Sequence, residues 1–581
     1  MASIDELFKK PLSAASAKRK LDATKDPNEL YKAAKLEANG DVKSTGKAPM
    51  VEDEQEDDVE AGPELPPDFD AEDIPDDEEG RFFGGGMERQ TAQAMQYIDE
   101  QDRGEKVPEK FDVTWLRRFA LNFEKKISKN SELRGKFENE PQKFMASEAD
   151  LDGEIKELSI LSEHPELYSE FSSMGCVGSL ISLLSHENAD IAIDTIQVIS
   201  ELTDEDVEAE QEQWDTLLDA DLIELLAQNL SRLDEGSDVD RTGVYYVLSV
   251  LENLASQTSI AEKIVQESGM LQWLLTRVQQ KERPVSQNQQ YSAEVLSILL
   301  QSSSKNRRKF VDLEGVDSLL QLLSQYRKCD PEKDSEEEEY AENLFDCLIC
   351  IVDEDAGKEK FLYGEGIELA QIMLKEGKFS KLRALRVLDH ALGGFGGAPA
   401  CEKLVEAAGL RTVFGMFMKK QENQINEHLL GIFASLLRLL PGGSATRIRA
   451  LAKFMEKDYE KIEKLVKLRR ECASRVTPVE QDIAKERKNF TKEEQEIMEG
   501  EWLSRRFDAG LFSLQLIDVI LAWLVAEDDG AKQKIVSLLA DRDESLSLIC
   551  NTLQEQVEGL RDDEPGQKEH KEMLETLLQF L

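Results

Sequence analysis

Residues 269–278 read GMLQWLLTRV, and a phrase of this kind occurs six times along the chain. An apolar segment of helical periodicity follows each phrase after a polar loop. The intervals between successive phrases are 43 to 51 residues, so one structural unit recurs along the chain. Five of the six phrases open on a glycine, where a turn between two helices favours a permissive backbone. The other phrases begin at Gly175, Asp221, Gly315, Gly366 and Gly409.

This spacing is close to the roughly 40–47 residues of armadillo and HEAT repeats. One pair of helices cannot bury its apolar face alone, so successive pairs stack into a continuous core. We therefore expect an all-α, armadillo/HEAT-like right-handed superhelical solenoid. About six repeats would occupy residues 174–445, with an N-terminal helical cap over 111–173 and a C-terminal helical region over 446–581.

The first 110 residues differ in composition from the rest of the chain. Residues 1–47 carry ten basic and seven acidic side chains, whereas residues 48–80 carry sixteen acidic side chains and no basic one. The segment lacks apolar periodicity, and we expect a disordered, acidic N-terminal tail. Its basic clusters, Lys9-Lys10 and Lys18-Arg19-Lys20, fit either a nuclear import signal or a solvated run of charge.

The whole chain of 581 residues has a formal net charge of −47. Such an excess argues against direct binding of DNA and against an extended RNA contact, both of which need clustered Lys and Arg. It favours a basic protein segment as the partner. The longest apolar stretch is interrupted by Gln515 and Asp518, so we expect no membrane contact.

Residues of catalytic or metal-binding type are scattered. Cys347 and Cys350 form a CxxC inside an apolar helical segment without a second pair at zinc spacing. The Gly-rich stretch at 393–399 lacks the Lys-Ser/Thr of a phosphate loop. The sequence therefore predicts a protein that is not an enzyme and that holds neither a metal nor a cofactor.

Several long phrases together resemble the beta-catenin-like protein 1 family, among them FLYGEGIELAQIML, RALRVLDHALGGFGG, EHLLGIFASLLRLL and KFMASEADLDGEIKELSILSEHPELY. The resemblance covers about residues 115–581. It implies a nuclear armadillo protein of pre-mRNA splicing. It also implies basic, localisation-signal-like segments of splicing factors as partners, within the spliceosomal nineteen complex and including its Myb-type component.

The last helix of an armadillo unit lines the inner surface, so its polar residues are candidate contacts for a ligand. Repeats of this class often carry an asparagine there, and Asn253 stands at the matching place. The regular asparagine ladder of import adaptors is absent. Nearby carboxylates could attract Lys or Arg, or could pair with cations of the chain itself; they are Glu201, Glu252, Asp346 and Asp389.

Two other functions fit the same sequence. A nuclear transport adaptor is one, although it would need the missing asparagine ladder. An assembly subunit that contacts its partners only through the C-terminal helices is the other. Apolar helices near the C-terminus also make a homodimer an open alternative.

Overall fold

The computed structural model describes residues 110–204, 221–266, 269–560 and 565–581. The chain divides into two units, Met1–Glu109 and Lys110–Leu581, and only the second contains described residues. The described residues form helices and no strand. The expected disordered tail and its basic clusters, from Lys9 to Lys20, lie outside the described residues.

The repeating unit contains three helices rather than two. Each phrase forms the second helix of a unit, and the apolar segment after it forms the longer third helix. The second helices are α7 (Cys176–Ser182), α10 (Leu222–Arg232), α13 (Met270–Gln279), α16 (Gly315–Leu323), α19 (Gly366–Glu376) and α22 (Leu410–Phe417). The third helices are α8 (Ala189–Leu202), α11 (Asp238–Ala255), α14 (Gln287–Ser302), α17 (Glu336–Val352), α20 (Phe379–Leu392) and α23 (Asn423–Leu439).

A short first helix precedes the second helix in five units. These helices have only six to nine residues, which is too short for a clear apolar period. They are α6 (Tyr168–Ser173), α12 (Thr258–Gln266), α15 (Ser304–Asp312), α18 (Asp355–Tyr363) and α21 (Ala398–Glu406). In the unit of α10, the residues before the second helix lie outside the described range.

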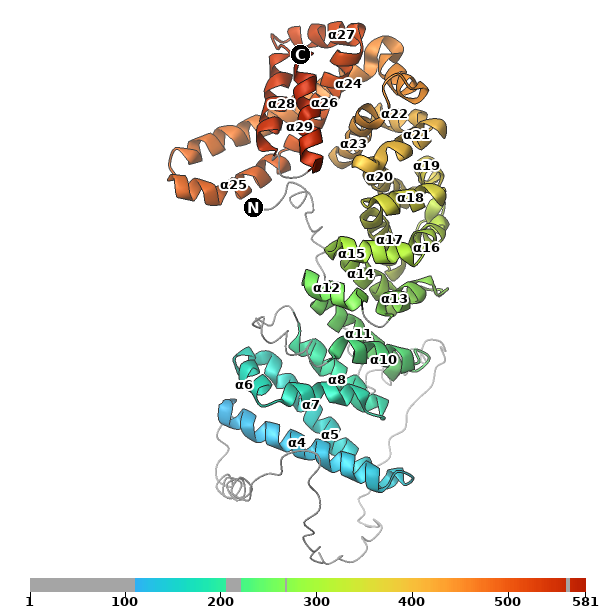
Figure 1. Ribbon diagram of the computed structural model, residues 1–581, viewed down its shortest axis with the longest axis vertical. Helices are drawn as coiled ribbons and strands as arrows, with labels where there is room; N and C mark the ends of the chain where they lie inside the picture. The colour runs from blue at the N-terminus through green and yellow to red at the C-terminus, as the bar shows by residue number, and fades with distance from the viewer. Residues whose placement is uncertain (1–109, 205–220, 267–268, 561–564) are drawn as a thin grey trace, which may run out of the picture. The chain divides into compact units, whose positions relative to one another are not determined.

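The units are stacked in chain order, as the colour sequence of Figure 1 shows. Each third helix packs against the third helix of the next unit, whereas the second helices of neighbouring units make few contacts or none. The third helices therefore form the tightly packed inner layer of the stack. One continuous apolar core runs through it, from Leu116 to Leu577. This is the all-helical armadillo-repeat fold that the sequence predicts.

The glycines at the start of the second helices have two different roles. Gly175 and Gly269 adopt a left-handed backbone with φ of 77°, as the turn requires. In three later units the left-handed residue is instead the one before the glycine, namely Glu314, Glu365 and Ala408. There the glycine is needed for space, because a Cβ on Gly315 or Gly366 would collide with Phe310 or Phe361, and one on Gly409 with Leu404.

Further helices extend the stack at both ends. The N-terminal part contains α4 (Val113–Lys136), α5 (Met145–Glu157) and the 3₁₀ turns η1 (Pro141–Lys143), η2 (Leu158–Glu163) and η3 (Pro165–Leu167). Additional 3₁₀ turns lie within the repeats: η4 (Leu183–Ser185), η5 (Ser324–Arg327) and η6 (Phe395–Gly397). The C-terminal part contains α24 (Ala445–Arg487), α25 (Lys492–Asp508), α26 (Leu511–Glu527), α27 (Asp529–Ala540), α28 (Ser547–Gly559) and α29 (Pro565–Leu578).

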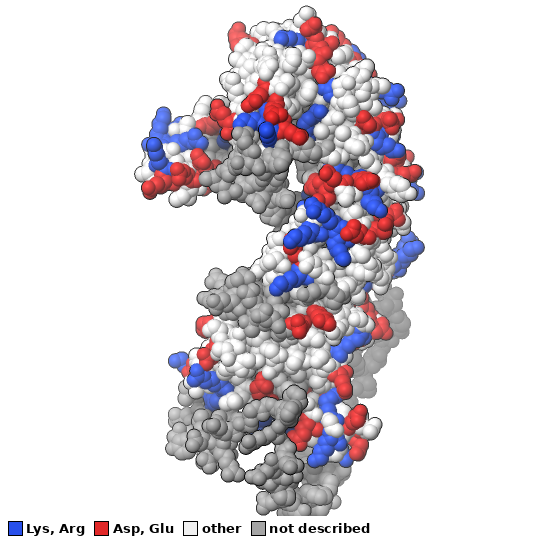
Figure 2. Space-filling model, in the orientation of Figure 1, with Lys and Arg blue, Asp and Glu red and all other residues white. Residues whose placement is uncertain are grey.

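A buried ion pair joins two of these C-terminal helices. The guanidinium of Arg469 in α24 donates to the carboxylate of Asp518 in α26 over 2.6 and 3.1 Å, and both side chains are buried. Beyond it, the end of α24 and all of α25 form a helical hairpin that extends away from the other C-terminal helices (Figure 1). Figure 2 shows side chains of both charges on this hairpin.

Candidate functional site

The candidate site is the inner surface formed by the six third helices, which we call the lining helices. Their charge changes along the stack. The first four, α8, α11, α14 and α17, carry thirteen acidic side chains and one basic side chain. The last two, α20 and α23, carry four basic and two acidic side chains. The first four lining helices are therefore acidic and the last two are net basic, a distribution that would favour a cationic ligand over the N-terminal part.

The sequence-predicted residues of the C-terminal part are engaged by side chains of the next lining helix. Arg386 of α20 donates to Asp346 of α17 over 2.9 Å, and Arg383 pairs with Glu342 in the same interface. Burial raises the pKa of Asp346, and the charge of Arg386 opposes that shift. His428 of α23 lies 3.0 Å from Asp389 of α20. Asp346 and Asp389 thus have intramolecular partners.

A third pair of the same kind lies at the end of α17, where His390 contacts Asp353 over 3.0 Å. Burial lowers the pKa of His390, but the hydrogen bond and the charge of Asp353 outweigh it and raise the pKa overall. The ammonium group of Lys358, also buried, donates to the carbonyl oxygens of Val352 and His390. It thereby satisfies the C-terminal ends of two lining helices.

Asn253 also makes contacts within the stack. Its amide donates to the carbonyl of Ser200 over 3.3 Å and to the hydroxyl of Thr203 over 3.2 Å, both on or next to α8. The hydroxyl of Tyr291 in α14 donates to Glu252 over 2.5 Å. Burial, and then the charge of Glu252, raise the pKa of Tyr291. These bonds join α11 to the lining helix on either side.

A regular pattern emerges from these contacts. A carboxylate of the earlier lining helix meets a donor of the later one at three junctions, α11–α14, α17–α20 and α20–α23. It continues at α26, where Ser513 lies 3.5 Å from Glu427 of α23. Between α8 and α11, the bonds from Asn253 go to a carbonyl and a hydroxyl and not to a carboxylate. Glu201, half-buried on α8, accepts instead from the amide of Gln197 in its own helix, over 3.0 Å. Glu294 of α14 likewise accepts from Gln290 over 2.9 Å.

A pair of carboxylates that our sequence analysis did not single out joins α5 to α8, about two turns before Glu201. Asp152 of α5 and Asp194 of α8 interact with each other, and both contact Lys156, at 2.8 and 3.3 Å. Burial, together with a hydrogen bond to Asp152, raises the pKa of Asp194 to about 7. The only local signal in the sequence was the spacing of Asp152 and Lys156, four residues apart on one helix.

Three comparisons place the chain among known proteins. The model of the family described as "Catenin-beta-like, Arm-motif containing nuclear" matches residues 92–554. The chain belongs to this family. The Beta-catenin-like protein 1 homolog of Schizosaccharomyces pombe is 38% identical over 490 residues, covering 84% of this chain and 86% of that protein. Beta-catenin-like protein 1 of Homo sapiens is 37% identical over 490 residues, covering 81% of this chain and 86% of its own length.

Solved structures resemble this catenin-beta-like chain more distantly. A designed armadillo repeat protein in complex with the peptide (KR)4 is 13% identical, with a TM-score of 0.36, and covers 45% of this chain and 99% of its own. A structure reported with a phosphorylation switch that controls the interaction between cadherin and beta-catenin is 12% identical. Its TM-score is 0.42, and the match covers 74% of this chain and 65% of that one.

The CxxC of this catenin-beta-like chain lies on the lining helix α17. Cys347 is buried and Cys350 half-buried, and burial raises the pKa of both thiols, that of Cys350 to about 12. Within the described ranges, no group of three His, Cys, Asp or Glu side chains is arranged to hold a metal ion. The basic run at 305–309 forms part of α15, where Lys305 pairs with Glu262 and Arg307 with Glu354.

No single helix in the described part of the chain is long and apolar enough to cross a membrane. Taken together, α25 and α26 pass the same test by length and composition alone, but the two helices are bent by 67° at the break between them.

Proposed function

We propose that this catenin-beta-like chain is a nuclear, non-enzymatic scaffold of pre-mRNA splicing. Its acidic inner surface would hold basic, localisation-signal-like segments of splicing factors, including the Myb-type component of the nineteen complex. Family membership supports the nuclear setting, because the family description names nuclear Arm-motif proteins. Splicing and the named partners rest on the resemblance to the beta-catenin-like protein 1 family.

The observation that carries the proposal is the distribution of charge along the lining helices. A basic segment would be held over α8 to α17, and its contacts would include Asp194, Glu201, Glu252 and Glu294. Asn253, Asp346 and Asp389 would support this surface from within the stack instead of binding the ligand directly. Charge-assisted hydrogen bonds to Lys or Arg are roughly twice as strong as neutral ones.

The extent of the acidic surface sets the length of the ligand. Neighbouring packed helices are about 10 Å apart, so four lining helices span about 30 Å. An extended chain advances about 3.3 Å per residue. The surface therefore fits a basic segment of about nine residues.

The test is a binding measurement with a labelled nine-residue Lys/Arg-rich peptide at low and high salt. We expect the double variant Glu201→Lys, Glu294→Lys to lose at least about tenfold in affinity at low salt. The matched control is Glu359→Lys, Glu499→Lys, which changes the net charge equally at exposed positions of α18 and α25. Equal affinities for the two double variants would rule out the inner surface as the site.

The splicing role needs a separate experiment. The protein would be purified from nuclear extract with and without nuclease, and the co-purifying proteins identified. Splicing factors that stay bound after nuclease treatment, and that Glu201→Lys, Glu294→Lys releases, would support the proposal. Loss of all partners on nuclease treatment would mean that RNA tethers them.

One observation favours the alternative of an assembly subunit that binds through its C-terminal helices. Ile497 on α25 is 80% exposed at the surface of the hairpin formed by α24 and α25. Crosslinks to partners confined to residues 501–581 or to this hairpin would favour that alternative over the inner surface.

A further inference from the structure

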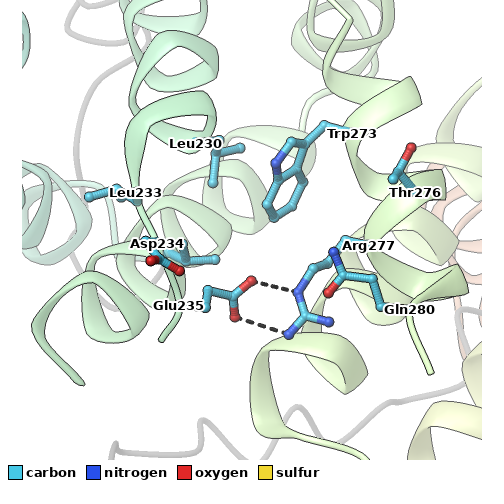
Figure 3. Close-up of a pocket in the computed structure, with 9 residues that line it drawn as sticks. Leu230, Leu233, Asp234, Glu235, Trp273, Thr276, Arg277 and Gln280 are labelled. Carbon is cyan, nitrogen blue, oxygen red and sulfur yellow. Dashed lines mark hydrogen bonds and ion pairs between the residues drawn. The ribbon is translucent and has the colours of Figure 1, made fainter. Parts of the chain in front are cut away.

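The outer layer of the stack contains a pocket that the proposed function does not use. Because the second helices of neighbouring units are spaced apart, a space of about 270 Å³ opens between the end of α10 and α13. Figure 3 shows Trp273, Thr276, Arg277 and Gln280 on one side. The opposite side is formed by Leu230, Leu233, Asp234 and Glu235, with Val244 of α11 completing the lining.

Part of this lining is an internal ion pair. The buried guanidinium of Arg277 donates to the two carboxylate oxygens of Glu235 over 2.6 and 2.9 Å, drawn as dashed lines in Figure 3. Glu235 also accepts from the amide of Asn288 over 3.0 Å, and Arg277 lies 3.1 Å from Glu282. This pair therefore fixes the wall, and the guanidinium of Arg277 is already engaged by two carboxylates.

Asp234 differs from Glu235 in this respect. Its side chain is exposed, and its carboxylate accepts a hydrogen bond from the backbone amide of Gly236 over 3.0 Å. Among the described residues, no Lys or Arg forms an ion pair with it. A carboxylate without a cation thus lies across the pocket from the indole of Trp273, which is itself only partly buried, and three aliphatic side chains complete the lining.

This combination matches one kind of side chain, a long aliphatic stem with a cationic head. The stem of a lysine or arginine covers apolar surface while its head stays near water and charge, and indole is the preferred aromatic partner of a cation. We propose that the pocket binds a lysine or arginine side chain of a protein partner, with the stem against Trp273 and Leu230 and the head at Asp234. The site lies in the outer layer, so it is distinct from the inner surface.

The test uses protein labelled with 5-fluorotryptophan at its five tryptophans, and the ¹⁹F signal of Trp273 is assigned by its loss in Trp273→Phe. The probe is N-acetyl-arginine N-methylamide, and N-acetyl-norleucine N-methylamide is its uncharged counterpart. We expect the arginine compound to shift the Trp273 signal saturably, and to do so also in Glu201→Lys, Glu294→Lys. The norleucine compound should leave this signal in place.

Asp234→Asn should weaken binding of the arginine compound about two- to fivefold, as expected for an exposed charge pair. Asp317→Asn, an exposed carboxylate on the second helix α16, is the matched control and should have no effect. Thermal unfolding would check that Asp234→Asn folds as the unsubstituted protein does. An absent shift, an equal shift with the norleucine compound, or unchanged affinity in Asp234→Asn would each overturn the proposal.

Discussion

Arg386 and Asp346, forty residues apart in the chain, lie 2.9 Å from each other on neighbouring lining helices. Two kinds of carboxylate can therefore be distinguished on the lining helices, those paired with a neighbouring helix and those that are not. Asp346 serves the packing of α17 against α20, whereas the one hydrogen-bond donor of Glu201 among the described residues is a glutamine of its own helix. The two carboxylates should therefore respond differently to the same conservative substitution.

We expect Asp346→Asn to lower the free energy of unfolding by about 1–3 kcal/mol, because Arg386 loses its carboxylate in a partly buried place. Its affinity for the basic peptide should change less than about twofold. Glu201→Gln should show the reverse, with near-normal stability and an affinity about three- to tenfold lower. Denaturant unfolding and peptide titration on both variants measure this, and the idea fails if Asp346→Asn weakens binding more than Glu201→Gln does.

Gly315→Ala should destabilise the protein by about 1–3 kcal/mol, because the new Cβ would overlap the ring of Phe310 in the core. Gly178→Ala is the matched control in α7, where a Cβ meets nothing within 4 Å. Removing a glycine from a helix interior should stabilise it by about 0.5–1 kcal/mol. The two changes in unfolding free energy should thus have opposite signs, and equal signs would contradict our account of the repeat glycines.

Asp194 gives a prediction on pH. Its pKa in the folded state is about 7, above the value of an ordinary aspartate, so the folded state binds a proton that the unfolded state has released. Stability from this group is present at low pH and is lost as pH rises from about 4 to 7. Asp194→Asn should remove that loss and be more stable than the unsubstituted protein at pH 8, by at least about 1 kcal/mol. Melting temperatures at pH 5 and pH 8 measure it, and a variant that is less stable at pH 8 would refute the assignment.

The buried pair Arg469–Asp518 should behave as a unit. Asp518→Leu alone leaves the guanidinium buried without its carboxylate and should cost about 3–5 kcal/mol. Adding Arg469→Met should restore a large part of that loss, since an apolar pair of similar volume needs no desolvation of charge. Unfolding of both single variants and of the double variant gives the coupling energy. Additive effects would mean that the two charges act independently.

The sequence predicts the third helices well, because each has 14 to 18 residues, and it predicts the second helices from their recurring phrase. The first helices, such as α15 and α18, are too short for that signal. The expectation that a glycine supplies the permissive backbone of the turn holds at Gly175 and Gly269, whereas Gly315 and Gly366 are needed for space. Gly315 is required by the ring of Phe310, five residues earlier, and that contact depends on how the first helix folds back on the second.

At the candidate site, the sequence predicted which acidic residues lie on the lining helices, but not which donors of the next helix they contact. Asp346, Asp353, Asp389 and Glu252 each meet a donor 37 to 40 residues later, which is close to one repeat length. A search for a carboxylate followed by Arg, His or Tyr at that distance would have found all four pairs. The Asp152–Asp194 pair and the pocket beside Trp273 have no such signal, because they depend on the spacing between units.

Carboxylates of α11, α17, α20 and α23 each meet a donor of a later helix, which gives the stack a direction, so its two ends are not interchangeable. At the C-terminal end, α26 supplies Ser513 to Glu427, which closes the series. A chain shortened at residue 440 would keep all six lining helices and still expose the apolar side of α23 and the carboxylate of Glu427 to water. Splice variants or proteolytic fragments that stop there are consequently poor candidates for stable minimal forms, even though they contain every repeat.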